Sequence, residues 1–319
     1  SNAELGQRLL DRLQSGQGDA RRFDAVLIDE AQDFDPVWFR CVLEALSDPN
    51  DGDLLIVGDR HQGLYGDRKI VWSELGIRAK GRSVSKKFDL ERNYRNTREI
   101  LALAAAFAQP PEAGEDSDEG SFSLVPVDPA LALRSHGIRP LLLTARDRTQ
   151  ETHCALALVE MLLHGTDSRY ERLAPEQIGI LYPWMPKIDE PLMDTFLTQL
   201  RTLAPTVWLA RGRDRYRVGE PGIKVQTIAG AKGLQYRAVI VLWADRLPRP
   251  FESSDPAEDA RLMYVALTRA EDYLFLTHSE PSTFLQRMQT SGACDSRSAA
   301  TLLRSSPSTS ADSLSRSQP

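Results

Sequence analysis

Two carboxylates, Asp29 and Glu30, directly follow the apolar run from Ala25 to Ile28. This run is too short for a core helix and has polar residues on both sides, which indicates a buried strand. Open α/β sheets bind ligands at the carboxyl ends of their parallel strands. A carboxylate pair at such a position can hold Mg²⁺ and orient a water molecule for the hydrolysis of a nucleoside triphosphate. The alternative interpretation is a strand that runs into an acidic turn.

A second apolar run, from Leu54 to Val57, is also followed by polar residues, among them Gln62. If the two runs are parallel strands of one sheet, Gln62 lies on the same sheet edge as Asp29 and Glu30. A side-chain amide at that edge can contact a γ-phosphate or the attacking water. Taken alone, a glutamine after a strand is more simply a turn residue, and its position beside the carboxylates favours the functional interpretation.

The elements that must position these side chains follow from apolar periodicity, capping residues and proline positions. The predicted helices span residues 5–13, 36–46, 98–107, 149–163, 191–203 and 256–270. Further strands are predicted at residues 141–144, 178–181, 238–243 and 273–277, and another begins at Lys224 and feeds a small-residue turn. Strands that alternate with helices predict an α/β fold with parallel sheets.

Composition sets modest bounds on function. The chain has 319 residues, of which 41% are hydrophobic and 26% charged, and its formal net charge is -6, as in ordinary globular proteins. Its three cysteines lie far apart with no pairing or metal-ligand spacing, which is typical of a reducing compartment. No apolar run is long enough to span a bilayer and no signal segment is evident, so a cytoplasmic location is predicted.

Two basic stretches contain aromatic residues or lie near them. Residues 78–98 carry eight basic and two acidic residues near Tyr65, Trp72 and Tyr94, a pattern typical of surfaces that stack on single-stranded nucleic acid. In residues 211–217, arginines alternate along the chain beside Tyr216. This second stretch is either a surface that contacts phosphates or an exposed edge strand with blunting charges.

Changes in composition predict the domain organisation. Residues 109–120 contain two prolines and five acidic residues without a basic one, which indicates a solvated linker. Residues 1–3 resemble the remnant of a cleaved tag, so an upstream part of the natural protein is expected to be missing. The predicted organisation is a tag remnant at 1–3, a first domain at 4–108, a linker at 109–123, a second domain at 124–285 and a Ser-rich disordered tail at 286–319.

Five separated stretches resemble helicase motifs II to VI of the superfamily 1 UvrD/Rep DNA helicases and occur in the order of those motifs. Each stretch alone is a weak match, but the ordered set spans roughly residues 24 to 280, which makes chance similarity very improbable. The stretches are Ile28-Asp29-Glu30-Ala31-Gln32-Asp33, Val57 to Tyr65, Leu90-Glu91-Arg92-Asn93-Tyr94-Arg95, Thr227 to Gln235 and Tyr264-Val265-Ala266-Leu267-Thr268-Arg269-Ala270.

The resemblance implies two RecA-like parallel-sheet domains, 1A and 2A, of which the first is incomplete at its N-terminus. In the family, ATP lies between these domains, and its hydrolysis moves the protein along single-stranded DNA. By the resemblance, Asp29 holds Mg²⁺ and Glu30 is the general base for the attacking water. Gln62 senses the γ-phosphate, and Arg95 and Arg269 neutralise the charge that develops on it.

The resemblance also implies nucleic-acid contacts, at Tyr65 and Trp72 by stacking on bases and at Thr227 by contacting the DNA backbone. The sequence departs from the family pattern at Ala229, where a His is usual, and at Gln235, where a Glu near the ribose is usual. The chain also has no GxxxxGK[ST] phosphate loop, so hydrolysis by this chain alone is not expected.

Two hypotheses from different classes follow. The first hypothesis is that the chain is part of an ATP-dependent DNA helicase or translocase that acts in DNA repair or processing and uses ATP and Mg²⁺. Its partners are single-stranded or partly duplex DNA and the missing N-terminal part of domain 1A. The second is a non-enzymatic module that keeps the helicase fold for binding nucleic acid or protein. The joint presence of the carboxylates, the glutamine and both arginines favours the first.

Overall fold

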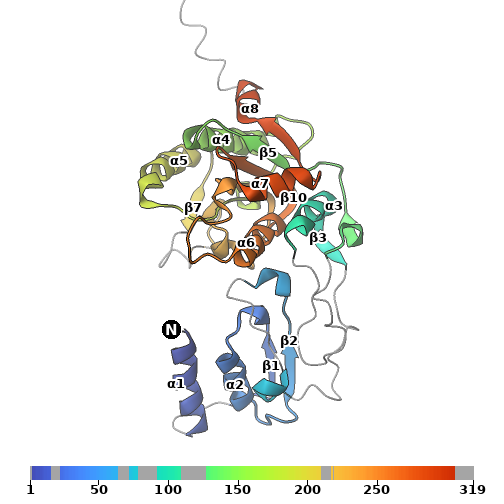
Figure 1. The fold of residues 1–319 in the computed structure, drawn as a ribbon, viewed down its shortest axis with the longest axis vertical. Helices are drawn as coiled ribbons and strands as arrows, with labels where there is room; N and C mark the ends of the chain where they lie inside the picture. Colours follow the sequence, from blue (N-terminus) through green and yellow to red (C-terminus); the bar gives the residue numbers. More distant parts are fainter. Residues whose placement is uncertain are drawn as a thin grey trace, which may run out of the picture. The chain divides into compact units, whose positions relative to one another are not determined.

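The computed structural model describes residues 2–15, 22–63, 72–77, 92–108, 127–209, 217 and 219–305 (Figure 1). The chain divides into two compact units: unit 1 contains residues 1–91 and 109–126, and unit 2 contains residues 92–108 and 127–319. Residues 92–108 therefore belong to the second unit, whereas the predicted boundary at 108 assigns them to the first. The reason is tertiary packing, because these residues contact the segment around residue 269, far along the chain.

Unit 1 is built on two parallel strands with helices beside them. The prolyl start of α2 is capped by Asp35, whose carboxylate accepts a hydrogen bond from Val37 N at 3.2 Å. Helix α1 packs on α2 around Leu10 and Cys41. These are the elements predicted for this region. Their bounds are α1 Asn2–Gln14, β1 Ala25–Ile28, α2 Pro36–Ala45 and β2 Asp53–Ile56, with 3-10 turns η1 Ala31–Asp33, η2 Arg60–Gln62 and η3 Trp72–Leu75.

Unit 2 contains a seven-stranded sheet in which all the paired strands are parallel, in the order β11-β5-β10-β9-β6-β8-β7. This confirms the predicted α/β fold class. A separate parallel pair, β3 and β4, lies beside the start of β10. The strands are β3 Asn93–Thr97, β4 Ala132–Arg134, β5 Leu141–Thr144, β6 Ile178–Tyr182, β7 Thr206–Leu209, β8 Ile223–Thr227, β9 Tyr236–Val241, β10 Ala270–His278 and β11 Asp295–Ser298.

Helices cover both faces of this sheet, as parallel sheets require because both of their faces are apolar. Helices α4 and α5 pack together on one face, whereas α3 and α6 pack together on the other (Figure 1). The bounds are α3 Arg98–Ala104, α4 Arg148–His164, α5 Glu190–Leu203, α6 Pro256–Thr268, α7 Thr283–Thr290 and α8 Ala299–Ser305. None of the helices in the described residues is long and apolar enough to cross a bilayer.

The C-terminal region differs from the predicted disordered tail at 286–319. Strand β11 extends the sheet by parallel pairing with β5, and α8 follows it and packs on α4. Ala299 at the start of α8 is buried in the main core of unit 2. The Ser-rich composition hid this strand because its stability comes from backbone pairing with a distant segment rather than from its own side chains. The part of the predicted tail after residue 305 lies outside the described residues.

A buried ionic cluster lies at the carboxyl edge of the unit 2 sheet. Arg148 pairs with Glu151 at 2.8 Å and with Asp245 at 2.5 Å, and both carboxylates are almost fully buried. Burial raises the pKa of Glu151. His278 lies next to this cluster and contacts Thr144 Oγ1 at 2.9 Å, and burial lowers its pKa. Arg148 lowers the pKa of His278 further, whereas Asp245 and a backbone hydrogen bond raise it.

The chain should therefore lose stability in mild acid through His278. Unfolding exposes this imidazole, whose ordinary pKa is about 6.5. Since the folded pKa is lower, the stabilisation is fully present above about pH 6.5 and is lost as pH falls through the folded pKa. The raised pKa of Glu151 changes the free energy of unfolding with pH in the opposite direction. To isolate the contribution of His278, urea unfolding should be compared between the parent and His278→Gln at pH 7.5 and 5.5. Equal losses of unfolding free energy in both proteins would contradict this prediction.

Candidate functional site

The carboxyl edge of the β1–β2 pair places the predicted catalytic side chains of unit 1 together. The strands pair in register, with Ile28 opposite Ile56, so both end at the same edge. Asp29 and Glu30 follow β1 directly, and Gln62 lies in the short turn η2 after β2. The structure thus shows the parallel arrangement that the sequence predicted for these three residues, although their chemical roles stay predictions.

A chain of hydrogen bonds joins Glu30 to Gln62 across this edge. The amide of Gln32 donates to Glu30 Oε2 at 2.5 Å, and its oxygen accepts from Asp59 N at 2.9 Å. Asp59 Oδ2 in turn accepts from Gln62 Nε2 at 2.7 Å. Gln32 and Asp59 therefore position the two candidate groups, a role that the sequence analysis did not assign. The sequence shows only that Gln32 and Asp59 are polar residues in the same two stretches as Glu30 and Gln62.

Glu30 has a left-handed backbone, with φ 53° and ψ 37°. This conformation costs a non-glycine residue about 1–3 kcal/mol and is found most often at functional sites. Two contacts hold it in place: Glu30 N donates to Asp29 Oδ1 at 2.8 Å, and Ala31 N donates to Val57 O at 3.0 Å. The edge of the sheet therefore fixes the direction of the Glu30 side chain at an energetic cost.

The carboxylates of this edge fit a magnesium ion that is held mainly by a nucleotide. Among the described residues there is no group of three or more His, Cys, Asp or Glu side chains that could hold a metal ion alone. Mg²⁺ is usually bound by one or two carboxylates together with substrate phosphates and water. Asp29 is exposed, and within the described part of the chain its carboxylate accepts one hydrogen bond, at Oδ1 from Glu30 N. Asp29 is therefore the side chain that would hold the ion.

In unit 2 the stretches around Arg95 and Arg269 lie side by side. The buried amide of Asn96 donates to Thr268 O at 3.0 Å and to Ala270 O at 2.6 Å, the two carbonyls that flank Arg269. Arg134 Nη1 donates to Arg95 O at 2.7 Å. The two predicted phosphate-contacting arginines are thus brought to one region of unit 2 from positions far apart in the sequence.

The Arg269 side chain is 1% exposed and bonds to the protein itself. Its guanidinium donates to Val265 O at 3.1 Å, Leu234 O at 3.2 Å and Thr268 Oγ1 at 3.2 Å. The Leu234 contact places Arg269 next to Gln235, which is exposed at the start of β9. The structure therefore groups Arg95, Arg269 and Gln235, but it holds the Arg269 guanidinium in contact with carbonyl groups rather than in solvent.

Thr227 ends β8 and begins the small-residue turn η10 Ala229–Ala231. Its hydroxyl accepts a hydrogen bond from Gly230 N at 3.1 Å, and the side chain is only half-buried. Gly233 has φ +79°, which explains why glycine occupies this position of the turn. Thr227 lies opposite Tyr182 of β6 in the sheet, so it sits at the carboxyl edge of unit 2, where open sheets bind ligands.

The aromatic residues predicted to stack on bases are placed differently from the expectation. Tyr65 lies outside the described residues. Trp72 is 4% exposed and packs in the core of unit 1, with its ring 5.7 Å from that of Phe39 in an edge-on contact. This packing corrects the prediction for Trp72, because a ring that fills the core does not offer a face to a base.

A different aromatic pair lies at the carboxyl edge of unit 2. The rings of Trp184, two residues after β6, and Phe251 are 5.0 Å apart. Arg246 lies over the Trp184 ring at 5.2 Å, and the two residues exchange hydrogen bonds, from Trp184 Nε1 to Arg246 O and from Arg246 Nη1 to Trp184 O. Phe251 is 48% exposed. No local sequence pattern reveals this pair, because Trp184 and Phe251 are distant in the chain.

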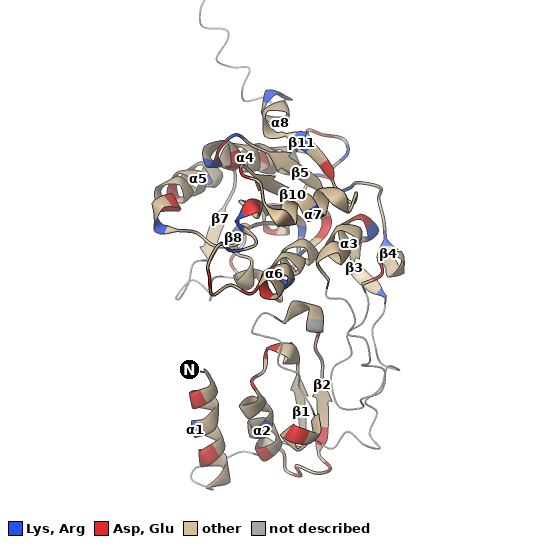
Figure 2. Ribbon diagram, viewed as in Figure 1, with Lys and Arg blue, Asp and Glu red and all other residues tan. Residues whose placement is uncertain are grey.

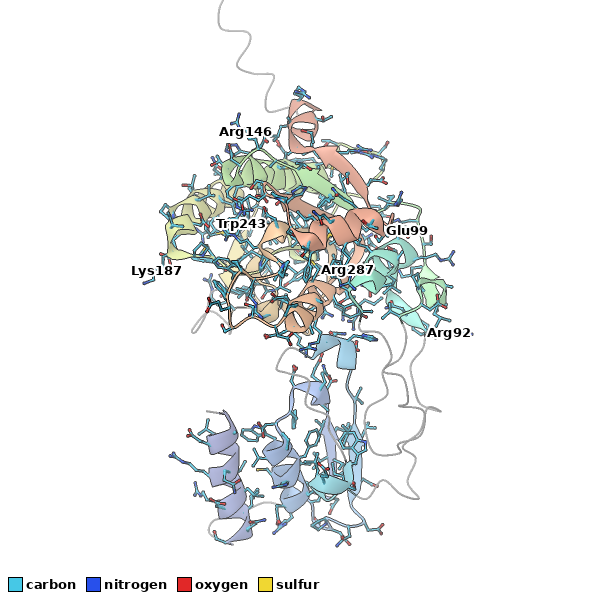
Figure 3. All side chains as sticks on the ribbon, in the orientation of Figure 1. Arg92, Glu99, Arg146, Lys187, Trp243 and Arg287 are labelled. Carbon is cyan, nitrogen blue, oxygen red and sulfur yellow. The ribbon has the colours of Figure 1, made fainter. Side chains whose placement is uncertain are left out.

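The basic side chains of the described residues do not gather into one surface that would indicate a nucleic-acid site. In Figure 2 basic and acidic segments are interspersed over each unit. Most of the first predicted basic stretch and nearly all of the second lie outside the described residues; Tyr94 is exposed. In Figure 3 Trp243 lies in the interior of unit 2, whereas Lys187 projects from its periphery. In the part of the chain that the structure describes, aromatic side chains are therefore clearer candidates for nucleic-acid contacts than a basic groove.

Comparison with known proteins gives matches in both units. Residues 9–72 match the family described as the UvrD/REP helicase N-terminal domain, and residues 144–281 match the UvrD-like helicase C-terminal domain. The chain is 28% identical over 125 residues to the ATP-dependent DNA helicase PcrA of Bacillus subtilis (strain 168). That alignment covers 38% of this chain and 17% of the PcrA chain.

A solved structure is also similar to this chain. It is the C-terminal domain of a possible DNA helicase from Lactobacillus plantarum WCFS1, with 16% sequence identity and a TM-score of 0.40. The alignment covers 64% of this chain and 98% of that one. The two family matches fall on the stretches that carry Asp29 and Glu30 in unit 1 and Thr227 and Arg269 in unit 2.

Proposed function

Since the chain belongs to the UvrD/Rep-like superfamily 1 helicases, with a family match in each unit, we propose that it is part of an ATP-dependent DNA helicase or translocase. Hydrolysis of ATP drives movement along single-stranded DNA, in repair or a related DNA process. The observation that supports this proposal is the hydrogen-bonded chain from Glu30 through Gln32 and Asp59 to Gln62, which joins the proposed base to the proposed γ-phosphate sensor.

In the proposed mechanism each residue keeps the role given above. Glu30 takes the proton of the attacking water, and Gln62 contacts the γ-phosphate. Asp29 would hold Mg²⁺, which would supply charge neutralisation at the phosphates. Arg95 and Arg269 of unit 2 stabilise the charge of the transition state, and Gln235 contacts the ribose.

We propose that a further polypeptide segment completes unit 1. Parallel sheets are normally buried on both faces, and an isolated two-stranded sheet is marginally stable. One face of the β1–β2 pair packs on Phe39 and Trp72. On the other face Leu27 is 74% exposed and stands opposite Leu55, which is also exposed, as is Val57. An apolar face of this kind supports completion by the N-terminal part of domain 1A, which would also supply the phosphate loop.

The proposal is tested by measuring ATP hydrolysis with and without single-stranded DNA. The natural protein, expressed from its own start codon, should hydrolyse ATP, and DNA should raise the rate. The present 319-residue chain should be inactive in the same assay because it has no phosphate loop. Inactivity of the natural protein in both conditions would favour the non-enzymatic module instead.

We further propose that Trp184 and Phe251 stack on the bases of the DNA strand, beside Thr227. Stacking on an aromatic side chain contributes about 1–3 kcal/mol per base. Trp184→Ala should therefore weaken the binding of a labelled oligothymidylate by about tenfold or more at fixed salt. Trp184→Phe should retain most of the affinity, because it keeps a ring.

Fluorescence anisotropy measures these affinities, and Trp208→Phe in β7 provides a matched tryptophan control. An unchanged dissociation constant for Trp184→Ala would exclude the stacking role. If the parent chain does not bind DNA, the proposed nucleic-acid function of this chain fails, and with it the stacking role of Trp184.

A further inference from the structure

A cavity of about 640 Å³ opens at the amino edge of the unit 2 sheet. It is lined by Arg237 at the start of β9 and by Asp272 and Tyr273 near the start of β10, with Arg134, His136 and Tyr170 contributed by neighbouring loops and β4. Thr227 and Trp184 follow the carboxyl ends of their strands, so this cavity is separate from the proposed DNA surface. It has no role in the helicase chemistry described above.

A buried carboxylate holds two guanidinium groups at this cavity. Asp272 is almost fully buried, and its two oxygens accept from Arg134 Nη2 and, at 2.6 Å, from Arg237 Nε. Arg134 also donates to Arg95 O at 2.7 Å, and Arg237 Nη2 donates to Glu171 Oε2 at 2.7 Å. Since a guanidinium has five N–H donors, several remain available on each side chain. Asp272 therefore fixes two arginines and leaves part of each free to bind.

The other walls of the cavity are rigid or polar. The ring of His136 stacks on Tyr273 with centroids 5.4 Å apart, and Tyr170 meets Tyr273 edge-on at 5.2 Å. Thr97 also lines the cavity, and its hydroxyl is buried without a hydrogen-bond partner. A buried hydroxyl without a hydrogen-bond partner destabilises the folded state, so a ligand that accepted its hydrogen bond would be favoured.

The arginines of the lining are held by carboxylates of unequal burial. Arg134 and Arg237 pair with Asp272 and Glu171, whereas Arg169 pairs with Asp167 at 2.6 Å. Both oxygens of Asp272 accept hydrogen bonds from its two arginines, whereas the Glu171 side chain is 68% exposed and, among the described residues, pairs with Arg237 alone. Glu171 can therefore leave without exposing a buried charge, and its departure frees further donors of Arg237.

We propose that this cavity binds the phosphate group of a small phosphomonoester. Paired guanidinium groups match the geometry and the double negative charge of such a group. The phosphate displaces Glu171 from Arg237, contacts Arg134, and accepts a hydrogen bond from Thr97. A phosphodiester in a nucleic-acid strand carries one charge and needs a continuous open track, which the ring walls do not provide. This proposal does not depend on the helicase assignment.

The test uses inorganic phosphate as the probe, titrated calorimetrically into the full chain at constant ionic strength. Arg237→Gln should weaken phosphate binding by about tenfold or more, because it removes a charge-assisted donor. Glu171→Gln should strengthen binding by about threefold, because the competing carboxylate is lost. The matched controls are Arg217→Gln and Glu220→Gln, another half-exposed pair in unit 2 at 2.8 Å, which should leave binding unchanged.

The opposite signs of the two effects separate binding from misfolding. If the Arg237→Gln variant unfolds, the affinity of Glu171→Gln for phosphate still tests the proposal, since tighter binding cannot arise from a damaged fold. Absence of phosphate binding to the parent chain overturns the proposal, as does equal binding by parent and Glu171→Gln. Displacement of bound phosphate by a DNA strand would assign the cavity to the nucleic-acid backbone and likewise overturn it.

Discussion

Glu30→Gln should lower the rate of ATP hydrolysis by the natural protein by about 10²- to 10⁴-fold, the usual contribution of a general base. The amide has the shape of the carboxylate and can still accept the hydrogen bond from Gln32, but it cannot take a proton from water. The local structure should therefore survive, and nucleotide binding should change little. The rate is measured by phosphate release in the presence of saturating single-stranded DNA.

Glu44→Gln is the matched control for this variant. Glu44 lies on α2 in the same unit and bonds to Gln14 at 3.3 Å, away from the carboxyl edge. It should retain the parent rate. If Glu30→Gln hydrolyses ATP as fast as the parent protein, Glu30 is not the base, and the left-handed backbone at this position must have another purpose.

Replacement of Arg269 should have a comparable or larger effect. An arginine that neutralises the transition-state charge of phosphoryl transfer contributes about 10³- to 10⁵-fold in rate. Because the side chain is buried and makes three bonds to its own unit, Arg269→Ala would also damage packing. Arg269→Lys keeps the positive charge but cannot reproduce the fork of donors. We expect its turnover number to collapse while the KM for ATP stays close to that of the parent, and we expect the melting temperature to fall modestly because buried hydrogen bonds are lost.

Arg172→Lys controls for the loss of a guanidinium contact in unit 2. Arg172 donates to Leu163 O at 2.9 Å, and this replacement should not affect turnover. A purely structural Arg269 would give the reverse pattern, with a lowered melting temperature and a normal turnover number in the protein that remains folded. Measuring both quantities on the same preparation distinguishes the two roles.

The sequence predicted those parts of the fold that local patterns determine. The run Ala25–Ile28 is a strand, and helix α2 starts at Pro36 with its cap at Asp35, because proline position and apolar periodicity act over a few residues. The joint position of Glu30 and Gln62 was also predictable, since two parallel strands in register end at one edge. The hydrogen bonds through Gln32 were not, because they depend on side-chain directions.

The parts that sequence reasoning missed depend on distant contacts. Motif resemblance suggested Trp72 as a base-stacking residue, but a motif does not say whether a ring faces solvent or, as here, Phe39. The Trp184–Phe251 pair has no local pattern, because its two members come from different loops. Strand β11 is composed of polar residues and exists only because β5 offers its edge.

The assignment of residues 92–108 to unit 2 has a consequence for synthesis on the ribosome. Asn96 finds its carbonyl partners at Thr268 and Ala270 only after about 170 more residues have been made. At roughly 5–20 residues per second, that interval lasts on the order of ten seconds or more. During this interval the apolar face of α3, which includes Ile100 and Leu103, is not yet covered by the rest of unit 2. Nascent chains of this protein should therefore depend on chaperones until the segment around Thr268 and Ala270 has emerged, and unit 2 should fold as a whole only after that point.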